Sequence, residues 1–160
     1  MTVLLVGAAV LAFRAVSVRA FLEVWSQTLP DTGRPVALSS PDIATLGDAA
    51  AVVVGDRAGY IYAFSLADGK AVPGWPARTG DIPVDSTPSV APLDPASPDD
   101  TVFVGVGNSA TPHAGGYEAF NPDGTERWFV PVKNPASDPQ AGRTSAVRAS
   151  LALGELQGGT

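Results

Sequence analysis

Residues 52–76 read VVVGDRAGYIYAFSLADGKAVPGWP and carry the pattern that decides the fold. A continuous β-branched run ends at Gly55, which is typical of a strand covered on both faces. The segment 60–64 alternates instead, so its aromatic side chains share one face of a strand. The Asp68-Gly69 pair predicts a hairpin turn into a fourth strand that carries Trp75.

The same features recur in the same order along the chain. Each recurrence has an apolar run that ends in glycine, then an Ala-Phe pair, then a tryptophan. The glycines are Gly7, Gly55 and Gly105, and the tryptophans are Trp25, Trp75 and Trp128. Openers with Ser, Thr or Ala before alternating apolar positions begin at Ser39, Ser86 and Ala149. This order indicates an internal repeat of about 50 residues.

Four short strands in each repeat, with both faces covered, predict a β-propeller. We therefore expect an all-β fold, a partial propeller of about three four-stranded antiparallel blades, some of them incomplete. The expected divisions are 1–30 as a partial first blade, 31–85 as a blade, 86–143 as a blade with loop insertions, and 144–160 as the start of a truncated blade. Because about three blades do not close a ring, we expect the chain to belong to a longer protein.

Residues 1–29 have a second interpretation. Val3–Phe13 is apolar and has the length of the hydrophobic region of an export signal, and Val18-Arg19-Ala20 would serve as a cleavage site within 1–20. No basic residue precedes the apolar run, which is also too short to span a bilayer. We favour the repeat over the signal, and N-terminal sequencing of the purified protein would decide.

The runs Val52–Gly55, Gly59–Phe64, Asp68–Lys70 and Gly74–Pro76 resemble the PQQ-like, or quinoprotein-type, propeller repeat. The opener and the Gly-Trp-Pro element also resemble the FG-GAP/VCBS class of bacterial surface propellers. The resemblance covers nearly the whole chain and implies the architecture, whereas a shared fold does not by itself imply an activity. No PQQ-binding or catalytic constellation maps onto these residues.

Calcium loops of the FG-GAP type need several oxygen ligands at alternate positions. The segment after the second opener has three carboxylates, Asp94, Asp99 and Asp100, but two prolines interrupt it and it contains no glycine. We interpret it as a solvated turn, and the three aspartates are only weak metal candidates. We predict no cofactor, with Ca²⁺ or PQQ as the alternatives.

The insert 106–116 is the candidate binding loop, with Asn108 and His113 as its candidate residues, because long loops on rigid scaffolds often carry function. It begins like a dinucleotide-binding loop, but Pro112 and the glycines after it prevent the helix that such a loop requires. His113 is the only histidine in the chain, and no nucleophile motif accompanies it.

The net charge of −6 and the lack of a basic cluster argue against nucleic-acid binding. We expect a non-catalytic binding or scaffold surface in a longer bacterial protein of the periplasm, cell envelope or exterior. The expected partners are a protein, peptide or polysaccharide and the remaining blades, with no membrane span. The alternative is a piece of a PQQ-dependent or other propeller enzyme whose catalytic residues lie outside this chain.

Overall fold

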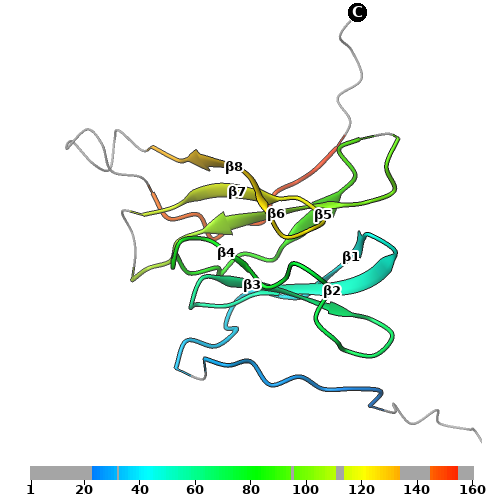
Figure 1. Ribbon diagram of the computed structural model, residues 1–160. Helices are drawn as coiled ribbons and strands as arrows, with labels where there is room; N and C mark the ends of the chain where they lie inside the picture. Colours follow the sequence, from blue (N-terminus) through cyan, green and yellow to red (C-terminus); the bar gives the residue numbers. More distant parts are fainter. Residues whose placement is uncertain (1–22, 32, 95, 111–113, 134–144, 155–160) are drawn as a thin grey trace, which may run out of the picture.

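The computed structural model describes residues 23–31, 33–94, 96–110, 114–133 and 145–154. The first sheet contains β1 (Asp42–Leu46), β2 (Ala49–Gly55), β3 (Tyr60–Ser65) and β4 (Ala77–Arg78). The second contains β5 (Ser89–Ala91), β6 (Thr101–Val106), β7 (Gly116–Phe120) and β8 (Glu126–Pro131). Both sheets are antiparallel, and their strands follow the order of the sequence (Figure 1).

The described residues contain no helix, so the all-β prediction is confirmed. The two four-stranded sheets fall within 31–85 and 86–143, and neither closes on itself. A propeller and the division into blades stay predictions. Residues 1–22 lie outside the described residues, and so do 134–144 and 155–160, at the end of the second complete unit and of the last expected unit.

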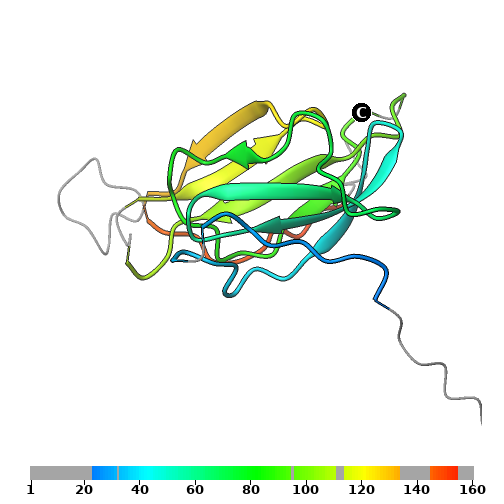
Figure 2. The same ribbon diagram turned by 60° about the horizontal axis from the view of Figure 1, so that its bottom comes forward.

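The hydrophobic core lies between the sheets, which form two layers (Figure 2). The first sheet contributes Ala44, Leu46, Ala51, Val53, Ile61 and Ala63, and the second contributes Val102, Val104, Val106 and Phe120. Within each strand these residues stand at alternate positions, so each sheet presents one apolar face to the other. The outer face of the first sheet is covered by residues 23–31, seen in blue in Figure 1.

Two of the strand predictions are confirmed and two need correction. All residues of β6 are buried, as predicted for a strand covered on both faces. In β2 only one face is fully buried, and Val52 and Val54 are half-buried because the short segment 23–31 covers their face incompletely. The aromatic alternation in β3 is confirmed, since the Tyr62 ring lies 5.9 Å from that of Phe64.

Trp75 was expected within the fourth strand, and this is wrong for the first sheet. There, β4 begins at Ala77, after Pro76. Proline has no N–H to donate to the ladder, so regular pairing starts only beyond it. In the second sheet Trp128 lies inside β8, as predicted.

Trp75 connects the two sheets. Its ring is 6% exposed and lies 6.3 Å from that of Phe120, and its Nε1–H donates to the carbonyl of Pro122 at 3.0 Å. Gly124 leaves room for this contact, because a Cβ there would lie 2.4 Å from the carbonyl oxygen of Gly74. The tryptophan of the first unit is thus held against the aromatic strand and the hairpin turn of the second.

Trp25 makes the same contacts one unit earlier. Its ring lies 6.5 Å from that of Phe64, its Nε1–H donates to the Leu66 carbonyl at 3.0 Å, and a Cβ on Gly69 would lie 2.7 Å from it. The tryptophan and the glycine of the repeat therefore have a physical role. Trp25 and Trp75 each pack onto the unit that follows in the sequence, whereas Trp128 lies 5.9 Å from Phe103 of its own sheet.

A second contact recurs just before the openers at Ser86 and Ala149, where one unit leads into the next. A Cβ on Gly55 would lie 2.4 Å from Val84, and a Cβ on Gly105 would lie 2.8 Å from Val147. Each valine donates its N–H, at 2.9 Å, to the carbonyl of the residue that follows the glycine. Residues 145–154 therefore lie against the second sheet as the residues around Val84 lie against the first.

We predict that Trp75→Ala lowers the free energy of unfolding by about 3–5 kcal/mol, the usual cost of removing a buried tryptophan. The control Trp25→Ala removes the same contact from a half-buried ring and should cost less. Urea unfolding of both variants, followed by circular dichroism, measures the difference. Equal losses would contradict the role given to Trp75.

We also predict that Gly55→Ala and Gly105→Ala each destabilise the chain by about 1–3 kcal/mol, because the new methyl group overlaps the valine packed on it. The control is Gly154→Ala, where a Cβ meets nothing within 4 Å. It should change stability by no more than about 0.5 kcal/mol. Thermal unfolding of the three variants tests the prediction, which fails if all three behave alike.

Candidate functional site

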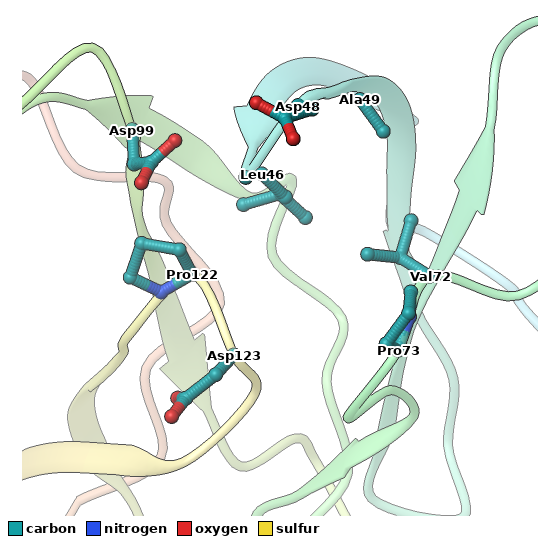
Figure 3. A pocket seen from close by; sticks show the side chains of 9 residues that line it. Leu46, Asp48, Ala49, Val72, Pro73, Asp99, Pro122 and Asp123 are labelled. Carbon is teal, nitrogen blue, oxygen red and sulfur yellow. The ribbon is translucent and has the colours of Figure 1, made fainter.

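A groove of about 540 Å³ opens at one end of the two sheets (Figure 3). It is lined by the β1–β2 turn, the segment before β4, the segment before β6 and the β7–β8 turn. The lining residues are Leu46, Gly47, Asp48, Ala49, Val72, Pro73, Asp99, Pro122 and Asp123. The groove therefore depends on how the sheets stack, because both of them contribute loops to it.

Three carboxylates from three different loops surround an apolar floor. Asp48, Asp99 and Asp123 stand around side chains that include Leu46 and Pro122 (Figure 3). None of the nine lining residues is basic or aromatic. The groove is thus suited to a group that is both positively charged and partly apolar.

The loop that carries Asp99 is held against β1 by its neighbour. The N–H of Thr45 donates to the Asp100 carboxylate at 2.7 Å, and the Asp100 N–H donates to the Thr45 carbonyl at 2.8 Å. Asp123 accepts hydrogen bonds from the hydroxyl and the N–H of Thr125, which lowers the pKa of its carboxyl. In the part of the chain that the structure describes, no hydrogen bond or ion pair reaches the carboxylates of Asp48 and Asp99.

The three weak metal candidates do not converge. Asp94 accepts from the N–H of Ala96, Asp100 accepts from Thr45, and Asp99 lines the groove. Among the described residues, His, Cys, Asp and Glu side chains form no group of three or more that would hold a metal ion.

The candidate binding loop is described only in part. Asn108 is 6% exposed, and its side-chain oxygen accepts from the N–H of Ala110, so this residue is held within the loop. His113 lies outside the described residues. Ligand binding by this loop stays a prediction.

The sequence analysis did not single out Asp48 or Asp123, and it therefore missed the groove. Asp48 follows Gly47 and Asp123 precedes Gly124, so both lie in turns, where aspartates are common on protein surfaces. One signal was available in the sequence. The loops that carry Asp48, Asp99 and Asp123 each connect two consecutive strands, and these connections lie at the same end of the stacked sheets. This signal can be recognised only when the way in which the two sheets stack is known.

No protein-family model matches this chain, and no curated protein is significantly similar to it. The described residues form no helix that is long and apolar enough to cross a membrane.

A buried carboxyl lies outside the groove, between the sheets. Glu118 of β7 is 4% exposed, and burial, together with the nearby charge of Glu126, raises the pKa of its carboxyl from 4.5 to about 8. Between these values the folded chain keeps a proton that the unfolded chain has lost. Raising the pH through this window therefore lowers the free energy of unfolding.

We predict a loss of stability of at most about 1.4 kcal/mol per pH unit across this window, absent in Glu118→Gln. Urea unfolding at pH 5, 6, 7 and 8 in buffer with EDTA measures the slope. The control Glu126→Gln leaves the burial of Glu118 unchanged, so this variant should retain most of the pH dependence of stability. Identical slopes in the wild type and Glu118→Gln would show that Glu118 titrates normally.

Proposed function

We propose that this chain is a non-catalytic segment of a β-propeller-type repeat protein, and that it binds a basic segment of a protein or peptide in the acidic groove. The observation that carries the proposal is the set of three aspartates around an apolar floor, with no basic side chain lining the groove. The partner would place Lys or Arg side chains among the carboxylates and lay their apolar stems on the floor.

Two features support the propeller. Consecutive four-stranded antiparallel sheets follow each other in sequence order, as the blades of a propeller do. The contacts of Trp25 and of Gly55 recur one unit later at Trp75 and Gly105, so the same packing relation applies at each step. The resemblance of 52–76 to PQQ-like repeats agrees with this architecture.

The lining favours a peptide over a polysaccharide. Aromatic rings bury large apolar areas and anchor many binding sites, and the groove has none among its lining residues. Carboxylates instead select cationic groups, and the chain as a whole is acidic, with a net charge of −6. Exposed ion pairs contribute only about 0.2–1 kcal/mol each, so we expect weak, salt-sensitive binding.

We predict that a fluorescent peptide of alternating Lys and Leu binds the chain, with an affinity that falls as NaCl rises. Asp48→Asn and Asp99→Asn should each weaken binding by about 1.5- to 5-fold, which corresponds to one exposed ion pair. Glu23→Gln, an exposed charge outside the groove, is the matched control. Fluorescence anisotropy measures all four proteins.

Two outcomes would overturn this proposal. The first is a wild-type chain that does not bind the peptide at low salt. The second is a loss of affinity in Glu23→Gln as large as in the groove variants, because the peptide would then respond only to the net charge of the chain.

A further inference from the structure

A second cavity, of about 190 Å³, lies where the segment after β4 meets the β7–β8 hairpin. The first sheet contributes Thr79, Gly80 and Ile82, and the second contributes Glu118, Glu126 and Phe129. The cavity is separate from the acidic groove and shares no lining residue with it. It contains two carboxylates and no basic side chain.

Glu118 is the buried member of this pair. It stands in the middle of β7, between Val104 of β6 and Phe129 of β8 in the register. Only 4% of it is exposed, and in the described ranges no hydrogen bond or ion pair reaches its carboxylate. A buried carboxylate without a partner is strongly unfavourable, so such groups are normally paired or coordinate a metal.

The neighbouring polar group in the cavity is already engaged. The hydroxyl of Thr79 lies within hydrogen-bond distance of the carbonyls of Gly59 and Ile82 and donates within its own segment. Glu126, at the start of β8, is exposed and lines the same cavity. Glu118 and Glu126 therefore line the cavity from the same hairpin, and the charge of Glu126 acts on Glu118.

The first sheet shows what the repeat places at this position. The Ala-Phe pairs of β3 and β7 align Tyr62 with Glu118, and Tyr62 donates its hydroxyl to Asp56 at 3.0 Å. In the second sheet Val106 stands where the first has Asp56, next to the repeat glycine, and Gly116 replaces an aromatic residue. The first sheet thus has a hydrogen bond between Tyr62 and Asp56 at this position, whereas the second sheet has the Glu118 carboxyl, which lines a cavity.

We propose that Glu118 and Glu126 bind a divalent cation, Mg²⁺ or Ca²⁺, in this cavity. Both ions prefer oxygen ligands, and Mg²⁺ in particular is often held by one or two carboxylates while it keeps several waters. A volume of this size has room for several waters that would complete the coordination. Once Glu118 has released its proton to the solvent, the two carboxylates match the charge of the ion.

The bound cation would hold two parts of the structure together. Glu118 and Glu126 belong to the β7–β8 hairpin, and the opposite wall is the segment Thr79–Ile82 that follows the first sheet. Water molecules on the ion would reach the carbonyl groups of that segment. Binding would thus stabilise the packing of one unit on the next, and this site goes beyond the peptide-binding function proposed above.

The test is isothermal titration of the full chain with MgCl₂ and with CaCl₂, in 150 mM KCl to screen non-specific attraction. We expect one saturable site in the wild type, with a rise in melting temperature at saturation. Glu118→Gln and Glu126→Gln should each weaken binding at least tenfold. Asp48→Asn and Asp123→Asn remove charges from the acidic groove and should leave the affinity for the metal ion unchanged.

Glu118→Tyr restores the residue type of the first sheet and fills the cavity, and it should abolish the metal response. If the two Glu118 variants do not fold, the exposed Glu126→Gln decides. Absence of saturable binding in the wild type would overturn the proposal. So would binding that survives Glu126→Gln, or binding that the groove variants weaken equally.

Discussion

The packing of each unit onto the next is the constraint on which the rest of the structure depends. Neither sheet can bury both of its faces alone, so stability requires a neighbouring layer. Trp75 against Phe120 supplies that contact between the sheets. Val84 packs on Gly55 where the first unit leads into the second, and both contacts have counterparts one unit away. The glycines are essential because an added Cβ would occupy the volume of the neighbouring valine.

Both candidate sites arise from this packing. The acidic groove forms where loops of the two sheets meet at one end, and the cavity of Glu118 forms where the second unit departs from the first. The repeat explains the difference between the two units. Tyr62 closes its position with a hydrogen bond to Asp56, whereas no residue in the described part of the chain forms a hydrogen bond with the Glu118 carboxyl.

The strands and the repeat could be predicted because their signals are local. The run ending at Gly55, the alternation of Tyr60–Phe64 and the Asp68-Gly69 turn each lie within a few residues. The start of β4 was misplaced because Pro76 delays its ladder. Glu118 was not singled out, because a glutamate in an alternating strand normally faces solvent.

The sequence by itself determined the all-β class, the four strands in each unit and the residues that repeat between units, because hydrophobic period and turn chemistry are short-range properties. Only the tertiary structure decided which carboxylates meet. Asp48, Asp99 and Asp123 lie far apart in the chain, and they gather because the two sheets stack with their loops at a common end. Stacking also buries Glu118, since burial depends on the neighbouring layer and is not encoded within one strand.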